Sequence, residues 1–363
     1  MPPVFLVAPA AFKGTLGPRR VAEAIAAGVR RALPEAVVLA CPVADGGDGL
    51  LEAVLPPGAL RERVPVAGPL GGTVAAELGW VDAETAIFES ATACGLALLK
   101  SEERDPLRAT SRGVGELIWE AIERGAKSVV VGLGGTATVD GGTGAARGLG
   151  WTFHDANGAP LPEGGGSLRD LAELGAGWGL GGLGARVIAL ADVTTPLVGP
   201  EGAAPVFAPQ KGAAPDAVVR LAAGLERLAV VMAQHGRPEL GALPGGGAAG
   251  GLGAGLAFFA KAQLIPGAEW VLSRVRFDAA LAQADLVITG EGLFDRTSLV
   301  GKAVGEVVHR AQAARKRVAV VAGRVEGLLG LHALGGDGRL LDEAGIAALA
   351  ERAACEAFGL PAA

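Results

Sequence analysis

The chain has 363 residues, of which 59 are glycine, and its net charge at pH 7 is −6. Because the 38 acidic residues outnumber the 32 basic ones, a surface for nucleic acid is not expected. Half of the residues are hydrophobic, which supplies enough apolar side chains for a buried core and argues against disorder. The length favours two domains.

The cysteine content and the uncharged segments bear on the cellular compartment in which the protein is expected. Cys41, Cys94 and Cys355 are odd in number and far apart, which argues against a disulfide framework or a zinc site and fits a reducing cytoplasm. The N-terminal residues lack the pattern of a signal peptide. Residues 241–260 carry no charge, but eight of them are glycine, so we expect a packed part of the fold and no membrane partner.

The first fifty residues have the pattern of a strand, a helix and a second strand. Residues 4–8 form a short apolar run that predicts a strand. A helix is expected to begin after Thr15 or Gly17, either of which can cap it, with Pro18 in its first turn, because proline favours that position. Apolar residues then recur every fourth position from Val21 to Val29, and residues 37–41 predict the next strand.

The middle of the chain begins with shorter, strand-like runs between residues 61 and 87. A helix is predicted over residues 110–124 and a buried strand over residues 128–131. Residues 157–184 are dense in glycine, and we expect loops there with a helix near Leu168–Leu174.

The remainder alternates between predicted strands and helices. Strands are predicted at residues 187–191, 285–289 and 318–322, and a helix at residues 217–234. Strands that alternate with helices across short loops are typical of an α/β fold with largely parallel sheets.

Polar side chains gather where these predicted strands end. In open α/β sheets, ligands bind beyond the carboxyl ends of the strands, so these side chains are candidates for a site. Each acid alone is more often a helix cap or a turn residue, but several in equivalent places favour a site that holds Mg²⁺ or a base. The candidates are Lys13, Asp45, Asp48, Asp140, Asp192, Lys211, Glu291, Asp295 and Lys302.

The loop at residues 132–142 is a candidate for phosphate binding, although alone it indicates such a site no more strongly than a plain tight turn. Its glycines let backbone N–H groups approach an anion, and Thr136 and Thr138 can donate hydroxyl groups, although a tight turn would also need glycine. The chain has neither the P-loop motif nor the dinucleotide-binding fingerprint, and its histidines show no catalytic pattern. Glycine loops with acids and lysines favour phosphoryl transfer.

Five segments together resemble the bacterial glycerate kinase family. They follow the order found in that family and lie within residues 7–323. The segments are 8–16 (APAAFKGTL), 44–49 (ADGGDG), 134–138 (GGTAT), 207–213 (FAPQKGA) and 290–292 (GEG) with Gly301 and Lys302. The resemblance implies transfer of the γ-phosphoryl group of ATP to D-glycerate with Mg²⁺, most simply to give 2-phosphoglycerate and ADP.

The resemblance also implies a fold of two α/β domains with the active site in the cleft between them. A Rossmann-like parallel-sheet domain would be built from both chain ends, residues 1–62 and 284–363. Residues 63–283 would form the inserted second domain, with a boundary near Arg63 that agrees with the change of pattern there.

The expected roles follow from the matching positions. We expect Lys13 and Asp192 to be catalytic, with Asp192 as the general base, and Asp45 and Lys211 to bind the substrate. We expect phosphate binding at Gly134, Gly135, Thr136 and Thr138, and Mg²⁺ at Glu291 and Asp295.

Three positions depart from the family, because Val139, Thr195 and Thr297 replace side-chain amides, and the acceptor preference can therefore differ. Three alternatives stay open: a kinase that forms 3-phosphoglycerate or acts on a related hydroxy acid, a dinucleotide-dependent oxidoreductase, and a non-catalytic sensor of a small ligand. The oligomeric state stays open too.

Overall fold

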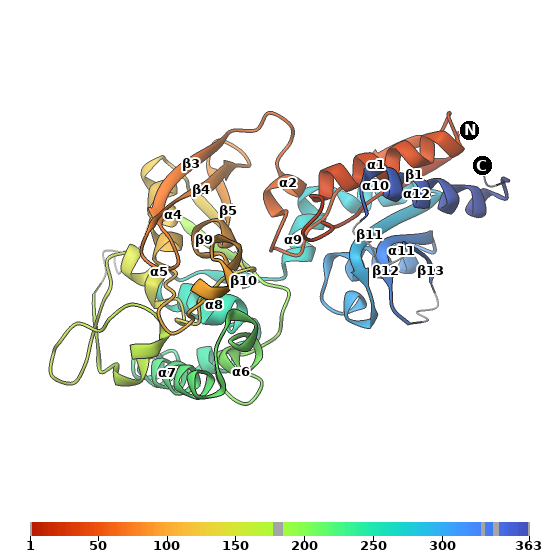
Figure 1. The fold of residues 1–363 in the computed structure, drawn as a ribbon. Helices are drawn as coiled ribbons and strands as arrows, with labels where there is room; N and C mark the ends of the chain where they lie inside the picture. The colour runs from red at the N-terminus through yellow and green to blue at the C-terminus, as the bar shows by residue number, and fades with distance from the viewer. Residues whose placement is uncertain (1, 177–183, 328–330, 337–340, 362–363) are drawn as a thin grey trace. The chain divides into compact units, whose positions relative to one another are not determined.

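The computed structural model describes residues 2–176, 184–327, 331–336 and 341–361 (Figure 1). It divides the chain into two compact units. Unit 1 consists of Met1–Pro56 and Pro266–Ala363, and unit 2 of Pro57–Ile265. Unit 1 is therefore built from both chain ends, whereas unit 2 is one continuous segment.

Unit 1 is organised around a parallel sheet. Among the described residues this sheet has five strands, in the order β13–β12–β11–β1–β2. Phe5 in β1 is paired with Leu286 in β11 and with Val38 in β2, so the N-terminal strand lies between a neighbour in sequence and a distant one. The strands are β1 (Val4–Val7), β2 (Val37–Ala40), β11 (Leu286–Phe294), β12 (Arg317–Val325) and β13 (His332–Gly335).

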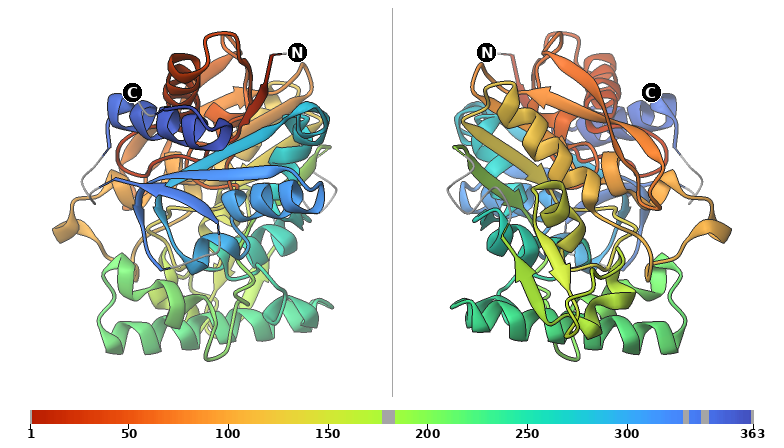
Figure 2. Two further views of the ribbon diagram at one scale, coloured as in Figure 1. Left: turned by 90° about the vertical axis from the view of Figure 1, so that its right-hand side faces the viewer. Right: turned by 90° about the vertical axis from the view of Figure 1, so that its left-hand side faces the viewer.

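Helices cover both faces of this sheet. Successive strand residues point to opposite faces, and accordingly Phe5 packs in the core with α1 and α12, whereas Leu6 packs with α9, α10 and α11. The ribbon views show α1 and α12 side by side along one face (Figures 1 and 2). The helices are α1 (Pro18–Ala32), α2 (Leu50–Val54), α9 (Gly267–Arg274), α10 (Phe277–Gln283), α11 (Ala303–Ala313) and α12 (Glu343–Phe358).

Unit 2 has a mixed sheet, for which the described residues supply six strands in the order β10–β9–β6–β5–β4–β3. The four strands from β10 to β5 are parallel, and β4 and β3 continue the sheet antiparallel. The strands are β3 (Arg61–Ala67), β4 (Thr73–Trp80), β5 (Thr85–Glu89), β6 (Ser128–Gly132), β9 (Arg186–Leu190) and β10 (Gln263–Ile265). A separate antiparallel pair is formed by β7 (Thr152–His154) and β8 (Glu173–Gly175).

One core joins this sheet to the helices of unit 2. The helices are α3 (Ala91–Cys94), α4 (Arg112–Glu123), α5 (Thr143–Gly148), α6 (Ala203–Phe207), α7 (Pro215–Gln234) and α8 (Ala248–Phe259). Short 3₁₀ helices lie at Leu96–Leu98, Ser101–Glu103, Gly165–Asp170 (η3), Pro209–Lys211 (η5), Pro238–Gly241 and, in unit 1, Arg296–Leu299 (η7).

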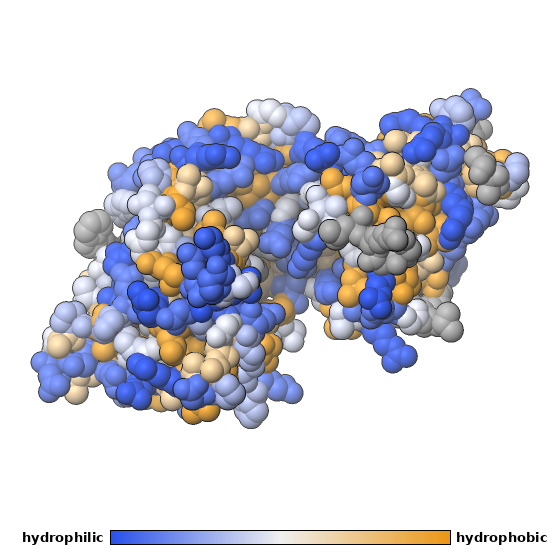
Figure 3. All heavy atoms as spheres, viewed as in Figure 1, coloured by the Kyte–Doolittle hydropathy of each residue, from blue (hydrophilic) through white to orange (hydrophobic). Residues whose placement is uncertain are grey.

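The uncharged segment at residues 241–260 is a packed part of unit 2. It contains α8, whose backbone turns left-handed at Ala249, Gly250 and Gly251 before the helix resumes. Across the described ranges, no helix has both the length and the apolar character needed to span a membrane. On the face shown in Figure 3, hydrophilic residues are interspersed with hydrophobic ones on both units.

The α/β prediction is confirmed, with a parallel sheet built from both chain ends and a second α/β unit between them. The helix expected near Leu168–Leu174 is wrong. The chain forms η3 and then β8, because Leu168 and Leu171 are buried in the core while Leu174 pairs with Phe153. Residues 177–183 of that glycine-dense stretch lie outside the described residues.

Candidate functional site

Unit 1 contains a cavity of about 320 Å³. Its lining comes from the segments that follow β1 and β2, from the last residues of β11 and β12, and from the start of α11. It therefore lies at the carboxyl ends of the parallel strands, where α/β folds bind ligands. The ionisable residues that line it are Lys13, Asp45, Asp48, Glu291, Lys302 and Arg324.

A tight turn presents Lys13 at this cavity. The Phe12 and Leu16 backbones pair across the turn, and Gly14 adopts a φ of +79°, which favours glycine. The Lys13 side chain is exposed at the tip. A lysine in this position provides a mobile positive charge for a phosphate or a carboxylate.

The acidic loop after β2 reaches the same cavity. The Asp45 side chain accepts a long hydrogen bond of 3.4 Å from the Gly47 N–H, and Asp48 is exposed. Gly49 begins α2 with a φ of +85°, and a Cβ there would lie 2.8 Å from Pro18 Cδ. The glycines therefore let this loop pack closely against α1 while its carboxylates line the cavity.

Glu291 is a largely buried ionisable side chain of the cavity, with 14% of its surface exposed. It lies on β11, which continues to Phe294 and does not end near residue 289 as expected. Burial raises the pKa of Glu291, and the negative charges of Asp45 and Asp295 act in the same direction. Ser298 and Lys302 lower it, and the Lys302 ammonium lies 3.9 Å from Glu291 Oε2.

The Glu291 environment fits a divalent cation. Its Oε1 atom is buried and has no hydrogen-bond partner in the described chain, and other carboxylates lie near enough to disfavour its charge. The described ranges hold no cluster of three or more potential metal ligands. Mg²⁺ needs only one or two protein carboxylates, because waters and substrate phosphates supply the remaining ligands.

Asp295 is less available than Glu291 for binding a cation. Its side chain caps η7 by accepting hydrogen bonds from the Thr297 and Ser298 N–H groups, at 2.7 and 3.2 Å. The Thr297 hydroxyl also donates to it, and these hydrogen bonds lower the pKa of Asp295. Asp295 does not line the cavity wall as Glu291 does, and all three hydrogen bonds go to its Oδ1 atom.

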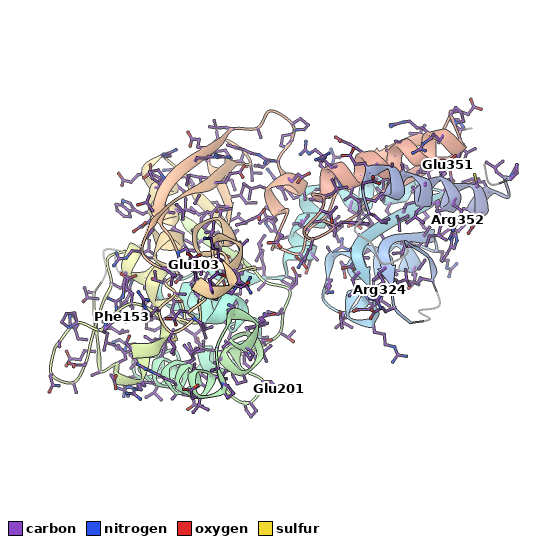
Figure 4. The ribbon with its side chains drawn as sticks, in the orientation of Figure 1. Glu103, Phe153, Glu201, Arg324, Glu351 and Arg352 are labelled. Carbon is purple, nitrogen blue, oxygen red and sulfur yellow. The ribbon has the colours of Figure 1, made fainter. Side chains whose placement is uncertain are left out.

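Two further cationic side chains line the cavity, and neither has a role predicted from the sequence. Lys302 precedes α11, and Ala303 and Val304 at the start of that helix line the cavity, so its positive end faces the ligand space. Arg324, labelled in Figure 4, lies near the end of β12 and also lines it. Sequence reasoning placed Lys302 at a strand end without a role and missed Arg324.

The candidate residues of unit 2 lie at the ends of its parallel strands. Ser90 follows β5, Gly134 follows β6 and Asp192 follows β9, and these three strands are neighbours. The Leu133 N–H donates to the Leu190 carbonyl at 3.0 Å, so the segments after β6 and β9 leave the sheet together. Asp192 is half-buried there.

The glycine loop after β6 divides into an accessible part and a buried part. Gly134 is half-buried and Gly135 is exposed with a φ of +63°. Thr136 and Thr138 have 3% and 0% of their surface exposed, so their hydroxyl groups are used inside unit 2. Thr138 donates to the Ala249 carbonyl at 3.5 Å. The Gly134 N–H donates a long hydrogen bond of 3.4 Å to Ser90 Oγ, so the Gly135 N–H is the loop donor best placed for an anion.

Lys211 lies beneath this loop. It ends η5, has 5% of its surface exposed, and donates to Thr136 Oγ1 at 3.1 Å and to the Thr138 carbonyl at 2.7 Å. Burial lowers the pKa of Lys211 to about 8, while Cys94 and Asp140 favour its charged form.

Asp140 is a buried acid that ties the end of the loop to two helices. Ser111, at the start of α4, donates to it from both its N–H and its hydroxyl at 2.8 Å. The N–H groups of Gly142 and Gly144, at the start of α5, donate to it at 3.1 Å. Burial raises the pKa of Asp140, and these hydrogen bonds oppose the shift. Its contacts are structural, as a capping residue's would be.

The structure thus collects the predicted residues into two groups. In unit 1, Lys13, Asp45 and Glu291 share one cavity. In unit 2, the loop residues Gly134 to Thr138 lie with Lys211, and Asp192 lies at the end of an adjacent strand.

Comparison with known proteins gives a consistent result. A family model described as the glycerate kinase family matches residues 5–338. A glycerate 2-kinase from Escherichia coli K12 is 42% identical over 325 residues, which cover 88% of this chain and 84% of the relative. A glycerate kinase from Halalkalibacterium halodurans is 40% identical over 306 residues, covering 82% and 79% of the two chains.

A solved structure agrees over almost the whole length. It is described as a glycerate kinase 2 from Salmonella typhimurium LT2, and it has a TM-score of 0.83 and 37% sequence identity to this chain. The match covers 99% of each chain.

Proposed function

Because the chain belongs to the glycerate kinase family, we propose that it transfers the γ-phosphoryl group of ATP to D-glycerate and forms 2-phosphoglycerate and ADP. The observation that carries this proposal is the unit 1 cavity, where cationic side chains, a helix start and a cation-suited carboxylate line one space. Phosphoryl transfer depends mainly on positioning and electrostatic stabilisation, which such a space provides.

The unit 1 residues would bind and orient charged groups. Lys13 and Lys302, with the N-terminal end of α11, would attract phosphate or carboxylate oxygens. Glu291, supported by Asp45, would hold Mg²⁺, which supplies charge neutralisation for phosphate oxygens when it is bound.

The unit 2 residues would contribute backbone donors and a base. The loop at Gly134 and Gly135 would bind phosphate oxygens, first through the N–H of the exposed Gly135. Asp192 at the end of β9 would accept the proton of the attacking hydroxyl group. A location in the cytoplasm stays a prediction.

The decisive experiment measures ADP release from MgATP with D-glycerate and a panel of other hydroxy acids, followed by NMR of the product. We expect turnover with D-glycerate and phosphate at the C2 oxygen. Phosphate at C3 would replace the proposed product, and turnover only with another acid would replace the substrate. Ligand-induced stabilisation without any ADP release would favour a non-catalytic sensor.

A further inference from the structure

The buried cation Lys211 contacts the inner side of the glycine loop after β6 and holds its conformation. Lys211 lies 75 and 73 residues from its two partners in the chain, Thr136 and Thr138. Both distances are those of good hydrogen bonds, at 3.1 and 2.7 Å, and the donor is charged, which strengthens them. The ammonium therefore directs two of its three N–H groups at the inner side of the loop.

The same loop is held on its other side by backbone hydrogen bonds. The Leu96 N–H donates to the Gly135 carbonyl at 2.8 Å, and the Ala137 N–H donates to the Cys94 carbonyl at 2.8 Å. Gly135 is itself one of the tied residues, and it and Gly134 remain accessible, whereas the residues that contact Lys211 are buried. Fixing the two threonines thus fixes the direction of the accessible backbone.

We propose that Lys211 is a positioning residue for the nucleotide phosphates and not a substrate ligand. Its ammonium sets the conformation of Thr136 to Thr138, and through them it directs the backbone N–H group of the exposed Gly135. The neighbouring Gly134 N–H donates to Ser90 Oγ at 3.4 Å. This inference rests on the proposed kinase function and replaces the substrate-binding role that the sequence suggested for Lys211.

The charged neighbours of Lys211 define how it should respond to pH. Cys94 from α3 and Asp140 from the loop are the titratable groups that face Lys211, and the ionised form of either would raise its pKa. Burial raises the pKa of Cys94 to about 12, so this thiol stays neutral up to at least pH 10. Lys211, with a pKa of about 8, is then the group in this cluster that loses its charge between pH 7 and about 9.

The first test replaces Lys211 by methionine, which keeps the length of the side chain but removes the donors. We expect the KM for MgATP to rise about 10- to 100-fold, because a buried charged hydrogen-bond donor is lost, while the KM for D-glycerate changes less than about twofold. Lys127→Met, at an exposed lysine before β6, is the matched control and should change neither constant. A rise in the KM for D-glycerate alone would overturn the proposal.

A second variant covers the case in which Lys211→Met does not fold. Thr136→Val retains the lysine and its hydrogen bond to the Thr138 carbonyl but removes one tie to the loop. We expect a smaller rise in the KM for MgATP, about 3- to 10-fold. Where Lys211→Met does fold, the effects in the double variant should not multiply, because both act through the loop. Independent, multiplying effects, or an unchanged KM for MgATP, would contradict the proposal.

The pH profile separates positioning by charge from simple packing. In the wild type, the KM for MgATP should rise as the pH increases from 7 to about 9, because neutral Lys211 makes weaker hydrogen bonds. In Lys211→Met this change should be absent, and its persistence there would overturn the role of the charge. Absence of any glycerate phosphorylation by the wild type would instead reject the proposed function.

Discussion

At the scale of single residues, Glu291 has the environment that most favours a cation. One of its oxygen atoms is buried without a partner in the described chain, and burial raises its pKa. Lys302 forms an ion pair with it, but the 3.9 Å separation between the ammonium and Glu291 Oε2 makes this a weak one. A bound cation would remove the cost of keeping this carboxylate charged.

Replacing Glu291 by glutamine tests this interpretation with little change of shape. We expect kcat/KM to fall by about 100-fold and the Mg²⁺ concentration for half-maximal activity to rise, because a neutral amide binds Mg²⁺ weakly. The measurement is a Mg²⁺ titration of ADP release. The control is Glu23→Gln on the exposed side of α1, and an unchanged Mg²⁺ requirement in Glu291→Gln would contradict the cation role.

Lys13 and Asp192 are the residues to which we assign catalysis. With saturating ATP and D-glycerate, Asp192→Asn should lower kcat by at least about 100-fold, because an amide cannot accept the hydroxyl proton. Lys13→Ala should lower kcat by a similar factor, because a positive charge that stabilises the transferring phosphoryl group is lost. Near-normal turnover of either variant under these conditions would show that its assigned role is wrong.

The buried charge of Lys211 also links stability to pH. Burial lowers its pKa from 10.5 to about 8, so between these values the folded chain binds fewer protons than the unfolded chain. The free energy of unfolding therefore rises with pH in this window. Relative to Lys211→Met, the wild type should gain up to about 3 kcal/mol between pH 8 and pH 10.5, measured by urea unfolding. A flat or falling difference would contradict this assignment.

At the scale of elements, the left-handed turn inside α8 explains two of the eight glycines in residues 241–260. A Cβ on Gly250 would lie 1.9 Å from the Thr138 carbonyl oxygen, and one on Gly251 would lie 2.9 Å from Gly141 Cα. The Gly141 N–H donates to the Gly250 carbonyl at 3.1 Å. The turn therefore brings the backbone of α8 directly against the glycine loop, which only residues without a side chain permit.

Alanine at Gly250 should separate this close approach from the effect of backbone angle alone. Gly236 has a similar positive φ, +82° against +72°, but a Cβ there meets nothing within 4 Å. We expect Gly236→Ala to cost about 1 kcal/mol of stability and Gly250→Ala about 3 kcal/mol or more, because the latter also displaces the loop. Equal losses in denaturant unfolding would show that the contact is unimportant.

The sequence predicted the strand cores but not all of their ends. The apolar runs at residues 4–8, 128–131 and 187–191 lie on observed strands, because buried parallel strands need continuous apolar residues. In β11 and β12, glycines were interpreted as strand ends. At Gly290 the backbones of β11 and β12 lie so close that a Cβ would be 2.0 Å from the Val321 carbonyl oxygen. Glycine therefore allows the two strands to stay paired at this position. Glu291 consequently lies on a strand.

The candidate site was predicted in its residue types and less well in its contacts. Strand-end position was enough to select Lys13, Asp45 and Glu291, which share one cavity. Burial of Lys211 beneath the loop depends on a contact between residues more than 70 positions apart, which spacing along one sequence does not reveal. Arg324 carried no motif, and only the extension of β12 places it at the cavity.

At the scale of the whole molecule, the two units differ in how the chain builds them. Unit 2 is continuous from Pro57 to Ile265 and has its own sheet and core. Unit 1 joins residues 1–56 to residues 266–363, and its central pairing is between β1 and β11. The domain boundaries expected from the sequence, after residues 62 and 283, stay a prediction.

We expect an isolated segment of residues 57–265 to fold cooperatively. All strands of its mixed sheet and the partners of Lys211 and Asp140 lie within it. The checks are a cooperative thermal transition and a near-ultraviolet circular dichroism signal from the mostly buried Trp151. Residues 1–56 alone should stay unfolded, because β11, β12 and α12 are missing. An unfolded 57–265 segment would show that unit 2 depends on unit 1.

The position of β1 between β2 and β11 has a consequence for synthesis on the ribosome. Phe5 is paired with Leu286, so one edge of the first strand to emerge has no partner until about 280 further residues have been translated. At ordinary elongation rates this interval lasts some tens of seconds, during which the middle segment can complete its own core. The nascent N-terminal strand and amphipathic α1 therefore form the segment for which a chaperone would be most useful.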